Sequence, residues 1–149
     1  MIKKFFKRTF LFVAVSIFSF NLHAADWTMA SGYPKSNFHT QNIIKFIDDV
    51  KSTTSVNINL NPNDTLIKLD AIKTSLQRGQ IPIGEIRLGI YGNEDPMYIL
   101  AGLPFIAPDY SSAWLLKDVQ MEYLQEKFSK KGLMILYTAP WPGQGFYTK

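Results

Sequence analysis

The order of strand-like and helix-like segments constrains the fold of this chain more than any other feature. Three segments have the composition of strands, and stretches with helical spacing separate them. A β-α-β-α-β order requires parallel strand pairing, because each helix returns the chain to the same end of the sheet. We therefore predict an α/β domain with a mostly parallel sheet flanked by helices. The predicted strands are Asp26–Ala30, Ser55–Leu60 and Ile81–Ile90.

Two helices are predicted between these strands. The first has Ser36 as a candidate N-cap and apolar residues at helical spacing up to about Lys51. The second can be capped by Asp64, and Gly79 lies where a C-terminal glycine ends a helix. Their predicted buried stripes are Phe38, Ile43, Ile44, Ile47 and Val50 in the first, and Leu66, Leu69, Ile72 and Leu76 in the second.

The rest of the chain continues the same alternation. Apolar residues at helical spacing predict a long amphipathic helix from about Ser111 to Lys130, and Leu133–Ala139 is predicted as a fourth strand. A length of 149 residues, of which 46% are hydrophobic, is enough for one core of ordinary domain size. We expect one α/β domain over residues 25–149.

The N-terminus has the composition of a secretory signal peptide. Four basic residues among the first eight precede the apolar run Thr9–Phe20, and small residues follow, which predicts cleavage after Ala24. An uncleaved membrane anchor would look similar, but a spanning helix needs about 20 apolar residues and this run is shorter. We expect residues 1–24 to be removed and the protein to be periplasmic. The absence of cysteine excludes disulfides, thiol catalysis and thiolate metal sites.

The net charge of +4 comes from the N-terminal basic cluster. Four of the 16 basic residues lie there, so residues 9–149 carry twelve basic and twelve acidic side chains. Nucleic-acid binding depends mainly on neutralising phosphates, and a neutral domain has no excess positive charge for it. We expect no nucleic-acid partner.

No catalytic or metal-binding constellation emerges from the residue pattern. His39 is the sole histidine after residue 24, and its place in the first turn of a predicted helix indicates a surface or capping side chain. The run Asn93–Asp95 offers oxygens for calcium but lacks the alternating ligand ladder of a dedicated loop. The glycine pairs match neither a phosphate-binding loop nor a dinucleotide fingerprint. We expect no enzyme activity, no metal and no cofactor.

Polar and aromatic residues gather where the predicted strands end. Because parallel strands end at one edge of a sheet, these residues should converge on a crevice suited to a small polar or organic-acid ligand. Arg87 carries the most weight, since a charge in so apolar a strand needs a carboxylate partner, either Glu85 or a ligand. Each residue could also be ordinary loop sequence. The candidate ligand-binding residues are Ser31, Tyr33, Glu85, Arg87, Tyr91, Trp141, Gln144 and Tyr147.

Four motifs occur in order along the chain. They are W-x-M-A-x-x-Y-P-x-x-N-F-H-T at Trp27–Thr40, GQIPIGEIRLGIYGNEDPM at Gly79–Met97, LPF at Leu103–Phe105 and APWPGQGFYTK at Ala139–Lys149. Together they resemble the substrate-binding proteins of TRAP (tripartite ATP-independent) transporters, the DctP-type family. The resemblance implies a type II periplasmic-binding-protein-like fold, in which two α/β domains joined by hinge strands and a long helix close around an organic acid. It also implies delivery of that acid to membrane permease subunits driven by an ion gradient.

The resemblance also assigns residues. Ala30–Tyr33 takes the place of the family's first ligand-contacting loop, and Glu85 and Arg87 take the place of contacts from the third strand. Gln144 stands where many members have an arginine; it can donate a hydrogen bond to a carboxylate but supplies no charge. The family's signature arginine, which pairs bidentately with the ligand carboxylate, lies in a second domain that this chain does not reach.

The sequence thus predicts the solute-binding component of a TRAP-type secondary transporter, truncated before its second domain. Without that domain to exclude water, we expect this chain alone to bind organic acids weakly or not at all. The membrane would be reached only through the permease. An alternative is a ligand-sensing or partner-docking periplasmic protein on the same scaffold. A secreted hydrolase is disfavoured, because no nucleophile, base and orienting group occur together.

Overall fold

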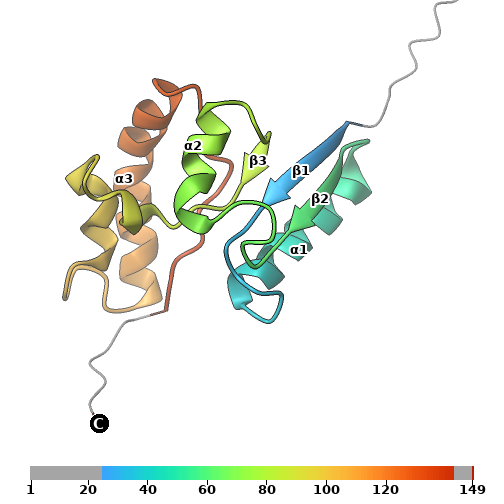
Figure 1. The fold of residues 1–149 in the computed structure, drawn as a ribbon. Coiled ribbons are helices and arrows are strands. Elements are labelled where there is room, and N and C mark those ends of the chain that lie inside the picture. The colour runs from blue at the N-terminus through green and yellow to red at the C-terminus, as the bar shows by residue number, and fades with distance from the viewer. Residues whose placement is uncertain (1–24, 143–148) are drawn as a thin grey trace, which may run out of the picture.

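The computed structural model describes residues 25–142 and 149. The predicted signal peptide, Gln144 and Tyr147 lie outside the described residues. A small parallel sheet is flanked by helices, which confirms the predicted α/β class (Figure 1). None of the described helices is long and apolar enough to cross a membrane. The elements are β1 (Asp26–Ala30), α1 (Phe38–Thr53), β2 (Asn57–Asn61), η1 (Leu69–Ala71), α2 (Ile72–Gln77), β3 (Ile83–Gly84), η2 (Leu88–Tyr91), η3 (Pro96–Gly102) and α3 (Tyr110–Ser129), where η marks a 3₁₀ helix.

The described sheet has the strand order β2-β1-β3, and both pairings are parallel. In the register, Asp26 lies opposite Asn57 and Met29 lies opposite Ile83. The predicted first strand has the observed bounds, and the predicted parallel pairing is confirmed. All three strands therefore end at the same edge of the sheet, as parallel pairing requires.

Apolar residues cover both faces of the central strand. Successive residues of a strand point to opposite faces, so Met29 packs toward α1 and Ala30 packs toward α2. Ile72 of α2 is fully buried, which stabilises the fold by about 1.5–3 kcal/mol relative to an exposed side chain. The cluster on the α1 face is Met29, Ile43, Ile58 and Ile83, and the cluster on the α2 face is Ala30, Ile72 and Ile81.

The helix starts differ from the predicted ones. Asn37, one residue after the predicted cap, accepts a hydrogen bond from the His39 N–H at 2.8 Å and caps α1. The predicted helix after Asp64 is wrong over its first part, because Asp64 has a φ of +56° and lies in a turn. Its Oδ1 accepts from the Leu69 N–H at 2.9 Å, and the chain reaches α2 through the short η1.

Two predicted strands are wrong in extent or in kind. The third strand, predicted over Ile81–Ile90, is only Ile83–Gly84, and η2 follows it. Gly84 allows α2 to approach closely, since a Cβ there would lie 2.6 Å from Cγ2 of Ile72. The predicted strand Leu133–Ala139 pairs with no described strand, because no neighbouring strand is present for its backbone to bond.

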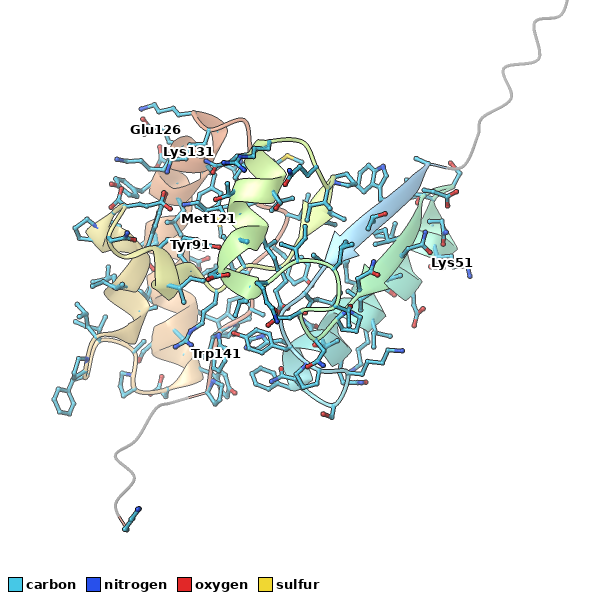
Figure 2. The ribbon with its side chains drawn as sticks, viewed as in Figure 1. Lys51, Tyr91, Met121, Glu126, Lys131 and Trp141 are labelled. Carbon is cyan, nitrogen blue, oxygen red and sulfur yellow. The ribbon has the colours of Figure 1, made fainter. Side chains whose placement is uncertain are left out.

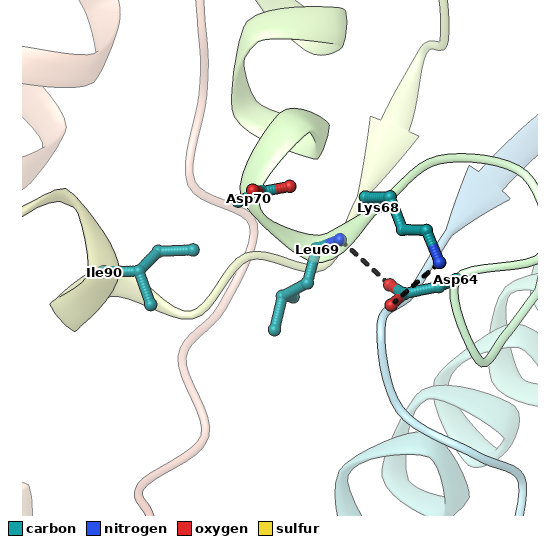
Figure 3. A pocket seen from close by; sticks show the side chains of 5 residues that line it. All are labelled: Asp64, Lys68, Leu69, Asp70 and Ile90. Carbon is teal, nitrogen blue, oxygen red and sulfur yellow. Dashed lines mark hydrogen bonds and ion pairs between the residues drawn. The ribbon is translucent and has the colours of Figure 1, made fainter.

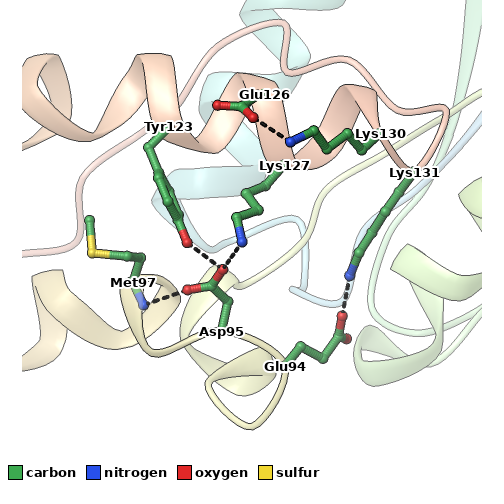
Figure 4. Close-up of polar contacts among 8 residues, drawn as sticks. All are labelled: Glu94, Asp95, Met97, Tyr123, Glu126, Lys127, Lys130 and Lys131. Atoms are coloured by element: carbon green, nitrogen blue, oxygen red, sulfur yellow. Dashed lines mark hydrogen bonds and ion pairs between the residues drawn. The ribbon is translucent and has the colours of Figure 1, made fainter.

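Two carboxylates join the segment around η3 to α3 and α2. Asp95 accepts from the Tyr123 hydroxyl at 2.7 Å and pairs with Lys127 at 3.2 Å (Figure 4). Glu94 pairs with Lys131 at 2.6 Å and with Lys73, which is buried. These hydrogen bonds hold the pKa of both carboxyls below their usual range. The acidic run that could have held calcium is thus engaged with hydroxyl and ammonium groups.

The long helix α3 confirms the prediction for residues 111–130 within one residue at each end. Asp109 caps it by accepting from the Ser112 N–H at 2.7 Å. Tyr91 and Tyr98 pack against Leu124 and Phe128 of the helix in a further buried cluster.

Candidate functional site

The ends of β1 and β3 bring two of the predicted residues together. Ser31 follows β1 and is fully buried, and its Oγ donates a hydrogen bond to Glu85 Oε2 at 2.5 Å. The Glu85 N–H donates to the Ala30 carbonyl at 2.9 Å, so the backbone fixes Glu85 against the end of β1. The parallel sheet therefore brings these two predicted residues into contact.

Burial controls the protonation of Glu85. Desolvation raises the pKa of its carboxyl, and the hydrogen bond from Ser31 offsets part of that effect. A carboxyl with a raised pKa accepts a proton more readily than a free one. It can therefore accept a hydrogen bond from a ligand N–H, or donate one when protonated.

Arg87 is exposed and lies beside Trp141, with the guanidinium carbon 5.3 Å from the centroid of the indole ring. Among the described residues it forms no ion pair, so Glu85 is not the partner that the sequence allowed for. Both charges lie near Tyr33. Its pKa is raised mainly by burial, while the charge of Arg87 lowers it and that of Glu85 raises it. The positive charge of Arg87 remains available to a ligand carboxylate.

Aromatic rings from three parts of the chain pack together, and one of them, Trp141, lies beside this charge. Trp141 lies where the end of the sheet meets the helical part of the molecule (Figure 2). Its ring centroid is 5.6 Å from that of Tyr33, with the two rings edge to face, and 4.8 Å from that of His39. Phe38 contributes a fourth ring, 4.0 Å from His39. Such pairs add about 0.5–1.5 kcal/mol each beyond the area that they bury.

His39 is not the surface or capping side chain that was expected. It is 4% exposed, and burial lowers its pKa, which favours the neutral imidazole. Its Nε2 and the Tyr33 hydroxyl are buried and have no hydrogen-bond partner among the described residues. The burial of His39 could have been predicted from the helical spacing, because His39 is four residues before Ile43 and so lies on the same buried face.

Tyr91 is not brought to this cluster. Its hydroxyl donates toward the carbonyls of Leu69 and Asp70, at 3.4 and 3.2 Å, and its ring lies 4.2 Å from Nζ of Lys73. The short η2 turns Tyr91 away from the sheet edge and into the packing between α2 and α3. The structure thus gathers five of the eight predicted residues: Ser31, Tyr33, Glu85, Arg87 and Trp141.

Two shallow hollows of the described chain lie elsewhere. One is lined by Asp64, Lys68, Leu69, Asp70 and Ile90 (Figure 3), and Asp64 there already bonds the Leu69 N–H and lies 4.0 Å from Lys68. The other lies on the apolar surface of α3. Among the described residues no group of three histidine or carboxylate side chains is placed to hold a metal. The candidate site is therefore an open surface with the exposed charge of Arg87, the half-buried carboxyl of Glu85 and a cluster of aromatic rings.

No protein-family model and no curated protein matches the chain. Solved structures do match it. The DctP6 extracytoplasmic solute receptor of Bordetella pertussis, which binds pyroglutamic acid, is 39% identical with a TM-score of 0.77. The DctP7 receptor of the same organism, also binding pyroglutamic acid, is 33% identical with a TM-score of 0.76. A marine metagenome TRAP solute-binding protein specific for pyroglutamate is 35% identical with a TM-score of 0.79.

The similarity covers most of this chain but less than half of those proteins. The matches span 79%, 80% and 84% of this chain, and 40%, 40% and 42% of the three solved chains in the same order. The chain therefore spans about 40% of the length of these neighbours. More distant TRAP periplasmic solute-binding proteins share the fold, such as one from Polaromonas that is bound to D-erythronate, at 22% identity and a TM-score of 0.64.

Proposed function

We propose that this chain, whose structural neighbours are TRAP periplasmic solute-binding proteins, captures a small organic acid for delivery to membrane permease subunits. Identities of 33–39% to three neighbours that bind pyroglutamate support this proposal. We further propose that residues 25–149 act as the first α/β domain of such a binder, ending at the hinge to a second domain. The protein would be periplasmic and would not be an enzyme.

The free guanidinium of Arg87 carries the proposal. A guanidinium binds a carboxylate through two parallel N–H···O bonds, and such charge-assisted bonds are the stronger kind. Arg87 pairs with no described carboxylate and already lies beside an aromatic face. A small carboxylate could therefore pair with Arg87 while its hydrocarbon part lies on the ring of Trp141.

Pyroglutamate is the ligand that we propose. It is a flat lactam ring with one carboxylate, one amide N–H and one amide carbonyl. Arg87 would take the carboxylate, and Glu85 would accept the lactam N–H while Ser31 holds the Glu85 carboxyl in place. The buried Tyr33 hydroxyl has no described partner and is available to the lactam carbonyl. The site would thus discriminate by the charge of Arg87 and by two hydrogen bonds to the lactam group.

The affinity of this surface alone should be low. Ligand sites usually bury most of the ligand's surface, whereas Arg87 is exposed and Trp141 is 40% exposed. A ligand on this wall keeps its other face in water. We expect a dissociation constant in the millimolar range, about −4 kcal/mol of binding free energy.

Calorimetry with pyroglutamate, malonate and D-erythronate tests the proposal. We expect weak heats that are largest for pyroglutamate and are lost in Arg87→Gln, with Lys68→Gln as a matched control away from the site. Micromolar binding by the purified chain would contradict the expectation that this surface alone binds the ligand weakly. Equal heats for wild type and Arg87→Gln would contradict the ligand site itself.

A further inference from the structure

His39 lies at the centre of the aromatic cluster that contains Trp141. Its ring centroid is 4.0 Å from that of Phe38, 4.8 Å from that of Trp141 and 5.7 Å from that of Tyr33. Trp141 lies farther from the other two rings, at 5.6 Å from Tyr33 and 6.3 Å from Phe38. Of these three described rings, that of His39 is therefore the nearest to the indole.

The backbone of His39 is fixed, whereas that of Trp141 belongs to no helix or strand. The His39 N–H donates to Asn37 Oδ1 at 2.8 Å, at the start of α1. The neighbouring Thr40 donates from its hydroxyl to the Tyr33 carbonyl at 3.2 Å, which ties the loop after β1 to α1. Trp141 is 40% exposed and lies in a segment without regular structure. The imidazole is thus the fixed member of the pair, and the indole is placed against it.

A histidine in this cluster is stable only when it is uncharged. Its side chain is buried, and Nε2 has no hydrogen-bond partner among the described residues. Burial lowers the pKa of the imidazole below its usual range. The attraction of a cation to neighbouring rings offsets only part of this cost, because a protonated Nε2 would still lack an acceptor. Acid therefore favours an arrangement in which the imidazole reaches water.

The charged and titratable groups around the cluster do not stabilise an imidazolium. Arg87, 5.3 Å from the centroid of Trp141, is itself positive. Glu85 accepts a hydrogen bond from Ser31 and forms no ion pair with His39. Tyr33 stays uncharged, since burial raises the pKa of its hydroxyl. Opening of the cluster is then the way to hydrate a protonated His39, and the exposed Trp141 is the neighbour that can move.

We propose that His39 is a positioning residue of the organic-acid site. Its neutral imidazole holds Trp141 beside Arg87, and its protonation in acid releases the indole and weakens capture of the ligand. The effect on capture rests on the proposed function, because the ligand is taken to lie on Trp141. The release of the indole does not require a ligand, so the two can be tested separately.

The ligand-free chain gives the first test. At about pH 7.5 we expect nuclear Overhauser contacts between the ring protons of Trp141 and those of Tyr33 and Phe38. These contacts should be lost over the pH range in which the His39 ring protons titrate, and in His39→Phe they should persist over the same range. Contacts that persist after His39 is protonated would overturn the inference. An imidazole that stays neutral down to about pH 4 would overturn it as well.

Pyroglutamate titrations at about pH 7.5 and about pH 5 give the second test. The carboxyl of the ligand stays ionised throughout, since an α-carboxyl titrates near about pH 3.5. The ratio of the dissociation constants at the two pH values should be at least about threefold larger in wild type than in His39→Phe, which retains Glu85 and so reports its share. At the higher pH, His39→Ala should bind at least about threefold more weakly than His39→Phe, because only phenylalanine supplies a ring against Trp141.

The outcomes separate the positioning role from the proposed function. Equal ratios in wild type and His39→Phe, or equal affinities of His39→Ala and His39→Phe, would overturn the role given to His39. If pyroglutamate binds none of these proteins at either pH, the proposed function fails. The ligand-free contacts would then still confirm or overturn the positioning of Trp141 by His39.

Discussion

The buried ammonium of Lys73 gives the sharpest stability prediction. Lys73 is 2% exposed and pairs with Glu94, whose side chain is 34% exposed. Removing one partner of a fully buried pair costs about 3–5 kcal/mol, because the other charge stays buried and unpaired. Since water reaches Glu94, and since the Tyr91 ring 4.2 Å from Nζ still faces the ammonium, we expect Glu94→Gln to cost about 2–3 kcal/mol.

Urea unfolding followed by far-UV circular dichroism measures this loss, and the melting temperature should fall by about 8–12 °C. In a Lys73→Met background the same Glu94→Gln change should cost less than about 1 kcal/mol, because only the exposed pair with Lys131 is then broken. Asp118→Asn, at an exposed ion pair on α3, should change nothing measurable. Equal costs of Glu94→Gln in both backgrounds would refute the role given to Lys73.

The pH dependence of this pair has a defined sign. Lys131 and Lys73 lower the pKa of Glu94 from its ordinary 4.5. The unfolded chain therefore binds this proton at a higher pH than the folded one. The stability that Glu94 contributes is present above pH 4.5 and is lost as the pH falls through its folded pKa.

Three further changes have expected outcomes. Burial raises the pKa of Glu85, so its ionised form opposes folding. The unfolding free energy of Glu85→Gln relative to wild type should therefore grow as the pH rises from about 4 to about 7, and a constant difference would count against this cause. Burial lowers the pKa of His39 below 6.5, so wild type should lose stability as the pH falls below that value. His39→Phe should show a shallower loss in urea midpoints, and parallel curves would contradict it. Gly84→Ala should cost about 1–3 kcal/mol, because its Cβ would meet Ile72 at 2.6 Å, whereas Gly89→Ala, with nothing within 4 Å, should stay within about 0.5 kcal/mol.

The spacing of apolar residues correctly predicted the elements that are specified by local sequence. The apolar residues of α1 recur at helical spacing, and its buried face carries Ile43 as predicted. The bounds of β1 and the length of α3 were predicted for the same reason. Parallel pairing followed from the order of elements, and that order was sufficient to bring Ser31 and Glu85 into contact.

Features that depend on distant partners were not predictable in this way. Alternation in residues 133–139 predicts a strand only where a neighbouring strand supplies hydrogen bonds, and the described sheet has none there. Tyr91 was placed at the site from its position after a strand, yet η2 turns it toward Lys73. His39 was judged by its residue type, whereas its helical register determined its burial.

The central claim is that Arg87 and Trp141 form one wall of an organic-acid site. Its most direct test is a titration of the ¹⁵N-labelled chain with pyroglutamate into the millimolar range, followed by the three indole N–H signals of Trp27, Trp114 and Trp141. We predict that the Trp141 signal moves together with the amides of Ser31 and Glu85, that the other two indoles stay still, and that Arg87→Gln abolishes the shifts. Shifts centred on Trp114, or shifts unchanged in Arg87→Gln, would contradict the account.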